Sequence, residues 1–530
     1  MKTLSNFAII IFSFFSAFLL SVSWASSNYS SHQDFIQCLE SHSDPSSPIS
    51  AVLYSPYNSS YSSVLQDYIR NLRFNESTTP KPRLILTALH VSHIQAAIIC
   101  AKAHRMQMKI RSGGHDYEGI SYRSNNPNFF ILDMFNFRSI NVSIEDETAS
   151  VEVGATLGEV YYRIAEKSST HAFPAGVCPT VGVGGHIGGG GYGNLMRKYG
   201  LTVDNIIDAQ IIDVNGRLLN RKSMGEDLFW AITGGGGSSF GVVLSYKIKL
   251  VRVPKVVTVF RVSRTYNENF TDLVYRYQEV ADKLPKELFI RLTLNGVNGT
   301  NRGTFRALFL GNSQELISVM NKHFSELALN QTDCIEMSWI ESVLFWTDLP
   351  TTPVNALLDR VPQSFSYLKR KSDYVKKPIP KQGLEFIFKK MVELQTPVLA
   401  FNPYGGRMAE ISPSEKPFPH RAGNIFKLQY ATNWDEDGEE AASRYLGVTR
   451  KLYDYMTPYV STAPREAFLN YRDLDIGINH NGRNSYVEGA VYGVKYFKDN
   501  FNRLVKIKTK VDPDNFFRNE QSIPILPWRK

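Results

Sequence analysis

The chain has 530 residues, too many for one hydrophobic core, so we expect two or three domains. Its 43% hydrophobic and 21% charged residues are typical of a soluble globular protein. The net charge of +9 comes from basic residues spread along the chain rather than clustered, so we expect no nucleic-acid partner. A basic surface of this kind permits attraction to acidic cell-wall polysaccharide.

The N-terminus has the parts of a secretory signal peptide, which we assign to residues 1–25. Lys2 supplies the positive start, residues 7–22 are apolar, and Ser23 and Ala25 are small residues at a cleavage site. The apolar run is shorter than the about 20 residues that span a membrane, so we expect no membrane span. We predict a secreted protein, and cell wall (apoplast) and vacuole both stay open. Seven sequons predict glycosylated loops, at Asn28, Asn58, Asn75, Asn141, Asn269, Asn298 and Asn330.

Four cysteines are present, and in an oxidising compartment we expect a pair of them to form a disulfide. We predict the pair Cys38 and Cys100, because both lie in the N-terminal region on predicted helices. Cys178 lies in a glycine-rich stretch and is expected to serve chemistry, whereas Cys334 is expected to be a buried free thiol. The chain has no C-x-x-C or H-E-x-x-H pattern, so we predict no metal site.

The first predicted elements form a βαβ unit. A short helix is predicted over 34–42, a strand over 84–87, an amphipathic helix capped by Ser92, and a second strand over 108–111. In parallel units of this kind, ligands bind at the carboxyl ends of the strands. The loop that follows the second strand is therefore a candidate site.

Two glycine-rich segments stand out. The loop RSGGHDYEG (111–119) carries His115, and the stretch 175–193 has nine glycines in nineteen residues, together with Cys178 and His186. Such density predicts backbone that turns through positive φ and lies close against a flat or anionic ligand. The apolar residues between the glycines argue against a linker, and no phosphate-binding P-loop follows. We interpret the two segments as two sides of one large cofactor site.

Three further local signals follow along the chain. Thr156 and Glu159 form a capping box that predicts a helix start, and Asn215-Gly216 predicts a hairpin. The run Gly234–Gly237 predicts another close approach of the backbone to the ligand.

The pattern of predicted elements changes after Pro254. Strands and amphipathic helices alternate there, and glycine runs are few. We interpret 254–464 as an α+β substrate-binding domain. Within it, the alternating run 425–431 predicts a strand on which Lys427 and Gln429 point to the same side.

Taken together, an ordered set of segments resembles the berberine bridge enzyme-like family of plant secreted flavoproteins, and within it the plant carbohydrate oxidases. The match covers essentially the whole mature chain. It rests on RSGGHDYEG, AGVCPTVGVGGH, GGGGYGNLMRKYGL, MGEDLFWAITGGGGSSFGV, PFPHRAGN, NYRDLD and KTKVDPDNFFRNEQSIP.

The resemblance implies an α+β fold in two parts. One is a two-part FAD-binding domain of the vanillyl-alcohol oxidase type, formed by residues 26–253 and by a C-terminal segment, 465–530, that returns to it. The other is the substrate-binding domain, 254–464, with an antiparallel sheet. Within the C-terminal segment we predict a helix over 486–501.

The resemblance also implies FAD held by two covalent bonds, from His115 to the flavin 8α methyl group and from Cys178 to C6. Imidazole and thiolate are effective nucleophiles, which fits this attachment. His186 corresponds to a family histidine near flavin N1, where a cation or a hydrogen-bond donor stabilises the reduced flavin. The remaining implied cofactor contacts are Arg111, Ser112, Gly113, Gly114, Gly182, Gly185 and Tyr192.

On the substrate side, the resemblance implies the catalytic residues Tyr471, Lys427, Tyr117, Tyr192 and Gln429. We expect Tyr471, its pKa lowered by Lys427, to take the hydroxyl proton of the substrate while hydride passes to flavin N5. Oxygen then accepts the electrons and forms H2O2, and Val181 corresponds to the family position that lines the oxygen approach.

The sequence departs from the family where GGH is followed by Ile187 and Gly188 instead of Phe and Ser, which puts the pocket shape in doubt. We expect oxidation of a carbohydrate at its reducing end, with an aromatic allylic alcohol next. Gln429 stands where alkaloid-cyclising members carry a carboxylate. Two alternatives stay open: an enzyme of specialised metabolism acting on a phenolic or alkaloid by oxidative cyclisation or non-redox cycloaddition, and a secreted wall-binding or defence protein with a vestigial flavin.

Overall fold

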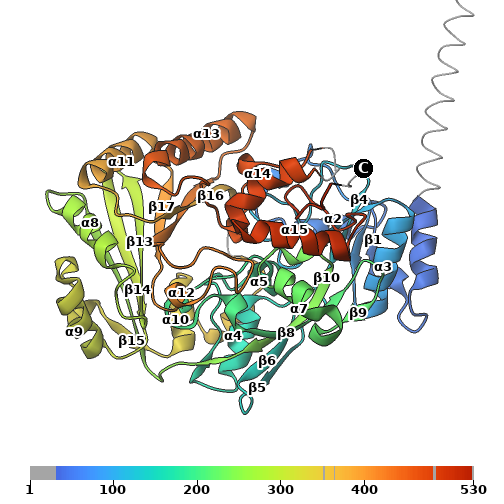
Figure 1. The fold of residues 1–530 in the computed structure, drawn as a ribbon, viewed down its shortest axis with the longest axis horizontal. Helices are drawn as coiled ribbons and strands as arrows, with labels where there is room; N and C mark the ends of the chain where they lie inside the picture. The colour runs from blue at the N-terminus through green and yellow to red at the C-terminus, as the bar shows by residue number, and fades with distance from the viewer. Residues whose placement is uncertain (1–31, 350–351, 363–364, 481–484, 528–530) are drawn as a thin grey trace, which may run out of the picture.

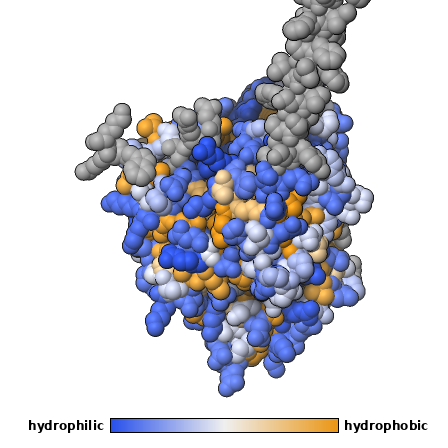
Figure 2. Space-filling view, turned by 90° about the vertical axis from the view of Figure 1, so that its right-hand side faces the viewer, coloured by the Kyte–Doolittle hydropathy of each residue, from blue (hydrophilic) through white to orange (hydrophobic). Residues whose placement is uncertain are grey.

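The computed structural model describes residues 32–349, 352–362, 365–480 and 485–527. The predicted signal peptide and the sequon Asn28 lie outside these ranges. No helix within them is long and apolar enough to cross a membrane. The face shown in Figure 2 is largely hydrophilic, with hydrophobic residues gathered near its middle. Six sequons are described and all are exposed, namely Asn58, Asn75, Asn141, Asn269, Asn298 and Asn330.

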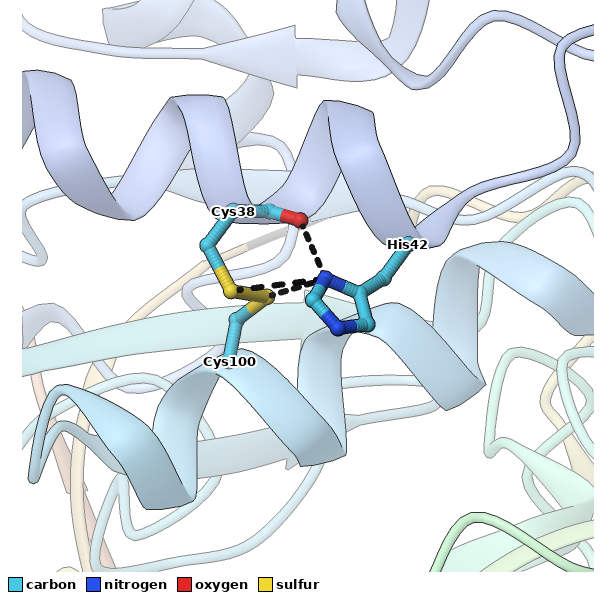
Figure 3. Close-up of side chains that lie close together, drawn as sticks. All are labelled: Cys38, His42 and Cys100. Carbon is cyan, nitrogen blue, oxygen red and sulfur yellow. Dashed lines mark hydrogen bonds between the residues drawn. A yellow bond between two sulfur atoms is a disulfide. The ribbon is translucent and has the colours of Figure 1, made fainter.

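A disulfide joins the first helix to the core, as predicted. Cys38 on the helix over 32–42 bonds Cys100 on α3 (Val91–Ala103), with 5.8 Å between their Cα atoms. The ring of His42 packs against this disulfide, and its Nδ1 donates to the Cys38 carbonyl oxygen at 3.0 Å (Figure 3). Because both sulfurs are bonded to each other, this grouping is not a metal site. Cys334 is free, but half-buried rather than buried.

The first sheet contains the predicted βαβ unit. Its order is β1-β2-β4-β3, and β4 lies between β2 and β3, parallel to both. The N-cap of α3 is His90 rather than Ser92, because a ring nitrogen of His90 accepts from the Ser92 N–H at 3.3 Å. The strands are β1 (Leu53–Tyr54), β2 (Ile85–Thr87), β3 (Gln107–Arg111) and β4 (Phe129–Asp133). The short helix α2 (Tyr61–Gln66) lies between β1 and β2 in the chain.

The second sheet has the order β5-β6-β10-β8-β9 and is antiparallel throughout. The hairpin predicted at Asn215-Gly216 joins β8 to β9, with Gly216 at φ 74°. The capping box of Thr156 and Glu159 opens α4, as predicted. The elements are β5 (Ile140–Ser143), β6 (Thr148–Glu152), β8 (Ile206–Ile212), β9 (Leu218–Leu219), β10 (Val242–Lys249), α4 (Leu157–Ala165), α5 (Val183–Gly188), α6 (Met196–Tyr199) and α7 (Arg221–Ile232), beside a small pair of β7 (His171–Ala172) and β11 (Val251–Arg252).

The predicted antiparallel sheet of the second part has seven strands, in the order β15-β12-β14-β13-β17-β18-β16. On β13, Ile290 and Leu292 belong to a core shared with helices on one face, whereas Phe289 belongs to the core of the first two sheets. The sheet therefore lies between its own helices and the first part of the molecule (Figure 1). The strands are β12 (Val257–Thr265), β13 (Leu288–Val297), β14 (Thr300–Phe309), β15 (Ile335–Met337), β16 (Tyr367–Val375), β17 (Val398–Pro403) and β18 (Phe426–Trp434). The helices are α8 (Phe270–Val280), α9 (Ser313–His323), α10 (Trp339–Trp346), α11 (Lys381–Leu394), α12 (Arg407–Glu410) and α13 (Glu439–Tyr455).

The C-terminal segment packs against the first two sheets. The helix predicted over 486–501 is two helices, α14 (Tyr486–Phe497) and α15 (Asn500–Val511), because Lys498 adopts φ 48° and ends the first one. Lys508 on α15 is fully buried and donates to the Ser239 carbonyl oxygen at 2.7 Å, which fixes this helix beside α7. The α+β architecture agrees with the prediction, and the domain boundaries at 253 and 464 stay predictions.

Candidate active site

The two glycine-rich segments lie backbone against backbone. A Cβ on Gly113 would come within 2.4 Å of the Gly182 nitrogen, and one on Gly182 within 2.3 Å of the Gly113 nitrogen. Only glycine fits at either position, since real Cβ atoms do not approach backbone so closely. The structure thus brings together the two segments that the sequence analysis assigned to one site.

The reason for the glycines differs in part from the prediction. Within 175–193, only Gly190 and Gly191 adopt positive φ, and the stretch includes the helix α5. Most of the others permit close packing rather than left-handed turns. The second run, Gly234–Gly237, approaches α5, because the Gly236 N–H donates to the Gly188 carbonyl oxygen at 2.8 Å. Its approach to the ligand stays a prediction.

His115 and Cys178 face the same region from the two segments. The Nε2 of His115 lies 2.9 Å from the hydroxyl of Thr180, two residues beyond Cys178. Burial lowers the pKa of His115 to about 3, so its imidazole is neutral and nucleophilic at physiological pH. Desolvation raises the pKa of the Cys178 thiol, and the guanidinium groups of Arg291 and Arg370 oppose that rise. The Cys178 residue is exposed, so a ligand can reach it.

The surface beside these two groups can accommodate a large flat cofactor. A Cβ at Gly185, on α5, would meet no protein atom within 4 Å, whereas Gly113 and Gly182 have no spare room. Gly185 is exposed, although the neighbouring His186 and Ile187 are buried. The open space over Gly185 lies in the same glycine-rich stretch as the Cys178 thiol, which fits a cofactor that reacts with that thiol.

Some of the predicted cofactor contacts point elsewhere. The guanidinium of Arg111 is buried and bonds the Asp133 carboxylate and the carbonyl oxygens of Val64 and Leu65. The Ser112 hydroxyl donates to the Val153 carbonyl oxygen at 2.6 Å. These two side chains hold the His115 loop in place, so we expect them not to contact the cofactor.

His186 is buried and neutral. Burial lowers its pKa to about 3, with a smaller contribution from Lys427. Its Nε2 lies 3.2 Å from the Gly176 nitrogen and 3.1 Å from the Thr202 hydroxyl oxygen. Of the two forms expected at this position, the structure favours the hydrogen-bond donor over the cation.

The unusual residues Ile187 and Gly188 lie away from the open space over Gly185. Ile187 is fully buried and belongs to the main hydrophobic core. A Cβ at Gly188 would lie 3.4 Å from the Gly237 nitrogen. The departure from the family pattern therefore alters packing behind α5 and not the surface in front of it. Val181 is half-buried and packs at the edge of the same core.

The five predicted catalytic residues form one cluster. The rings of Tyr117 and Tyr192 lie 5.8 and 5.9 Å from that of Tyr471, and the Tyr192 and Tyr471 hydroxyls are hydrogen-bonded. Gln429 donates to the Tyr117 hydroxyl at 3.1 Å. The Nζ of Lys427 lies 3.2 Å from the centroid of the Tyr192 ring and 4.5 Å from that of Tyr471.

Strand register explains why these side chains meet. Lys427 pairs with Asn402 on β17 and with Tyr374 on β16, and Gln429 pairs with Ser372 on β16. Residues directly opposite in antiparallel strands share a face of the sheet. The face turned toward the first part of the molecule therefore presents Lys427, Gln429 and Asn402 together.

The expected lowering of the Tyr471 pKa by Lys427 is wrong. Burial raises the pKa of Tyr471 well above its ordinary value. Lys427 is 1% exposed, has no carboxylate partner among the described residues, and burial holds its pKa well below its ordinary value. After burial, the groups that act on the pKa of Tyr471 are Tyr192, Tyr117 and Arg291, and Lys427 is not among them.

Tyr192 is easier to ionise than Tyr471. Its hydroxyl donates to Asn402 Oδ1 at 3.3 Å, so Tyr471 is the donor in the bond between the two hydroxyls. Burial raises the pKa of Tyr192, but Arg291 and the bond from Tyr471 oppose the rise. The same bond raises the pKa of Tyr471.

The sequence analysis missed several residues of this cluster. Arg291 donates from Nε to Asn402 Oδ1 at 2.7 Å, Arg370 lies 5.6 Å from the Tyr117 centroid, and Phe468 lies 3.7 Å from Lys427 Nζ. Arg291 could have been noticed as a charge among the apolar residues of β13. Asn470 bonds the Gly191 N–H and the Gly185 carbonyl oxygen, both at 3.0 Å, and ties the C-terminal segment to the glycine-rich stretch.

Comparison with known proteins reveals close relatives. Family models match residues 82–221, as an FAD binding domain, and residues 467–524, as berberine and berberine like. Berberine bridge enzyme-like 8 of Arabidopsis thaliana is 60% identical over 98% of this chain and 100% of its own. The structure of Phl p 4, a grass pollen allergen with glucose dehydrogenase activity, is 44% identical with a TM-score of 0.88, over 93% of this chain and 99% of that chain. Berberine bridge enzyme from Eschscholzia californica is 35% identical with a TM-score of 0.88, over 94% of this chain and 100% of that chain.

Proposed function

Since the chain belongs to the berberine bridge enzyme-like family of FAD oxidoreductases, we propose that it is a secreted oxidase of a hydroxyl-bearing substrate. The reducing end of a mono- or oligosaccharide is the favoured substrate, and an aromatic allylic alcohol is the second. The observation that carries the proposal is the buried contact of Tyr192 with Tyr471 and Lys427, beside a neutral imidazole and an accessible thiol.

His115 and Cys178 would hold the FAD by two covalent bonds, and Gly185 would lie beneath it. When bound, FAD would supply a hydride acceptor at N5 and a route for the two electrons to O2, which would leave as H2O2. Two attachments from different segments fix the cofactor without a deep enclosing pocket, which leaves room for a bulky substrate. The neutral imidazole of His186 would act toward the cofactor as a hydrogen-bond donor rather than as a cation.

In this chain, the geometry supports Tyr192 rather than Tyr471 as the group that takes the substrate's hydroxyl proton. Tyr471 donates to the Tyr192 oxygen and would stabilise its phenolate. Lys427 and Tyr192 titrate together, because an ammonium 3.2 Å from the ring would be attracted to the phenolate. Asn402, held by Arg291, orients the Tyr192 hydroxyl.

The lining supports a neutral ring-shaped alcohol. Tyr117, Tyr192 and Tyr471 offer aromatic rings, and Gln429 offers a polar amide. Aromatic faces pack against sugar rings and against aromatic alcohols alike. The glucose dehydrogenase activity of the relative Phl p 4 favours the sugar. The amide at Gln429 gives no carboxylate base for the oxidation of an amine.

The first test is anaerobic reduction of the flavin in the purified, secreted protein. Bleaching of the flavin absorbance by a reducing oligosaccharide would identify a carbohydrate-oxidising enzyme. Bleaching by an aromatic allylic alcohol alone would assign the protein a phenolic substrate. H2O2 formed on admission of air separates an oxidase from a dehydrogenase. A flavin that neither alcohol bleaches would overturn the proposal and leave the non-redox and wall-binding alternatives.

The covalent attachment has its own test. We expect Cys178→Ala to keep flavin bound through His115 alone, so that the denatured protein still carries flavin, and to turn over more slowly. A double variant that also carries His115→Ala should release all of its flavin on denaturation. If the flavin of Cys178→Ala keeps the absorption spectrum and reactivity of the natural protein, the role assigned to Cys178 is wrong.

A further inference from the structure

Five charged residues, which we call the charge network, meet in a buried cluster behind the tyrosines. Lys369 donates to Glu118 at 2.5 Å and to Asp473 at 2.7 Å. Lys371 bonds Asp473 and lies 3.1 Å from Asp475. The side chains of Glu118, Lys369, Lys371 and Asp473 are each at most 4% exposed. Burial of charges is costly, so a cluster with four buried charged side chains requires a structural or functional reason.

The charge network joins the two loops that carry tyrosines of the site. Glu118 directly follows Tyr117, and Asp473 is two residues beyond Tyr471. These loops are more than 350 residues apart in sequence, and Lys369 bonds to both. Among the described residues, no other side chain donates to both Glu118 and Asp473.

The strand that carries Lys369 also contacts the site from its other side. Side chains alternate along β16, so Arg370 points to the face opposite Lys369 and Lys371. The Arg370 guanidinium lies 5.6 Å from the Tyr117 centroid. β16 therefore contacts the Tyr117 loop twice. Lys369 bonds Glu118, the residue after Tyr117, and Arg370 lies over the Tyr117 ring.

The energetics make the connection stiff. A buried ion pair contributes little compared with an apolar replacement, but loss of one partner leaves a buried charge without compensation. Burial lowers the pKa of Lys369, and Asp473 and Glu118 more than reverse that effect, so its pKa is raised and the ammonium persists. If the Tyr117 loop moved away, Glu118 would lose Lys369 and keep only Arg73, at 3.7 Å. If the Tyr471 loop moved away, Asp473 would lose both Lys369 and Lys371.

We propose that Lys369 is a positioning residue that couples the Tyr117 loop to the Tyr471 loop through Glu118 and Asp473. The inference rests on the proposed function only in taking these tyrosines as substrate-facing. Movement of either loop then shifts both tyrosines, and the charge network keeps their two rings side by side at the site.

Amide hydrogen exchange of the holoenzyme tests the coupling without turnover. We expect Glu118→Ala to raise exchange about tenfold or more in 116–123 and also in 471–477, where no substitution was made. Glu118→Gln keeps an oxygen that accepts from Lys369, so its exchange should stay within about threefold of the natural protein. Asp475→Asn, which removes a carboxylate that Glu118 does not contact, is the control and should leave 116–123 unchanged.

Two results would overturn the proposal: faster exchange in 116–123 alone for Glu118→Ala, or equal effects of Glu118→Ala and Glu118→Gln. If Glu118→Ala is not secreted, the pair Glu118→Gln with Lys369→Gln replaces it, because neither residue then leaves a lone charge on the other. In that variant, faster exchange in 471–477 supports the coupling and unchanged exchange contradicts it.

The rate of anaerobic flavin reduction gives a second readout. At saturating substrate we expect Glu118→Ala to be slower by about tenfold and Glu118→Gln by less than about threefold, with equal flavin content. A natural protein whose flavin no alcohol reduces would refute the proposed function, while the exchange experiment would still decide whether the two loops are coupled.

Discussion

At the level of single residues, burial shifts the pKa of several basic groups of the site toward the neutral form. The pKa of Lys427, which lies among aromatic rings, is held well below its ordinary value, and His115 and His186 are neutral imidazoles. Burial is the largest cause in all three cases, because an enclosed site disfavours the charged form. Reactivity here therefore comes from desolvation and not from an attached cation.

The tyrosine pair gives the sharpest prediction at this scale. Tyr192→Phe should slow anaerobic flavin reduction by about 100-fold or more, since it removes the proton acceptor. Tyr471→Phe should slow it less and move the pH dependence to higher pH, because the bond that opposes the raised pKa of Tyr192 is lost. In the natural protein, the rate should rise with pH as the Tyr192 phenolate forms. Stopped-flow measurement of the flavin absorbance across pH provides the check, and a greater loss in Tyr471→Phe would return the role to Tyr471.

His186 provides a prediction about acid stability. Its pKa is about 3 in the folded protein, against about 6.5 for an unperturbed histidine. Between these values the unfolded chain binds the extra proton, so acidification destabilises the fold by about 1.4 kcal/mol per pH unit. His186→Asn should weaken the fall of the unfolding midpoint between pH 6 and pH 4.

The exposed His90 is the matched control for His186. As the N-cap of α3 it can be replaced by Asn, which is a good capping residue. His90→Asn should leave the pH dependence of the unfolding midpoint unchanged. Equal slopes in all three proteins would show that His186 is not responsible.

At the level of elements, α5 and the loop before it act as a platform. The segment from Gly182 to Gly191 touches the His115 loop on one side and Asn470 on another. The space where a Gly185 side chain would point stays open. Close backbone packing and an open patch thus occur within one short helix. The pattern of glycines alone could not separate the two uses.

Two glycine substitutions distinguish the glycines that permit close packing from the glycine under the open patch. Gly185→Ala meets no protein atom within 4 Å, so the fold should persist, and a helical Ala is favoured over Gly by about 0.5–1 kcal/mol. We expect it nevertheless to reduce flavin content, because the methyl group occupies the surface assigned to the cofactor. Gly182→Ala, which would clash with the Gly113 backbone, should lower both stability and flavin content. Full flavin content in Gly185→Ala would contradict the assigned position.

At the level of the whole molecule, three distant parts of the chain build one site. The first two sheets supply the His115 and Cys178 segments, the seven-stranded sheet supplies Lys427 and Gln429, and the C-terminal segment supplies Tyr471. Asn470 and the charge network hold this last segment in place. The site is complete only when all three parts have packed.

The disulfide stabilises this assembly from a distance. Cys38 and Cys100 close a loop with a sequence separation of 62 residues, and loss of such a bond costs about 2–4 kcal/mol. We expect a variant with both cysteines replaced by Ser to unfold at lower temperature yet to keep its flavin content and reduction rate once folded. Calorimetry and flavin absorbance measure the two effects, and a loss of activity at unchanged stability would contradict this separation.

The sequence by itself determined the α+β class, the Cys38–Cys100 pair, the capping box of α4 and the hairpin at Asn215-Gly216. The capping box and the hairpin depend on local turn chemistry, which the residues carry directly. The α+β class followed from the resemblance to the family, and the disulfide from the oxidising compartment and two predicted helices. The motifs shared with the family also assigned five residues to one site before any contact was known: His115, Cys178, Tyr192, Lys427 and Tyr471.

Only the tertiary structure decided the electrostatics and the partners. The pKa of Lys427 is lowered by burial. That burial requires all three parts of the chain to pack, and a pattern of alternating residues in one strand does not predict it. Arg291, Asn402 and Lys369 enter through strand register and through contacts across hundreds of residues. The break at Lys498 and the buried Ile187 likewise reflect packing, which overrides local preference because burial of a large apolar surface outweighs the small propensities of single residues.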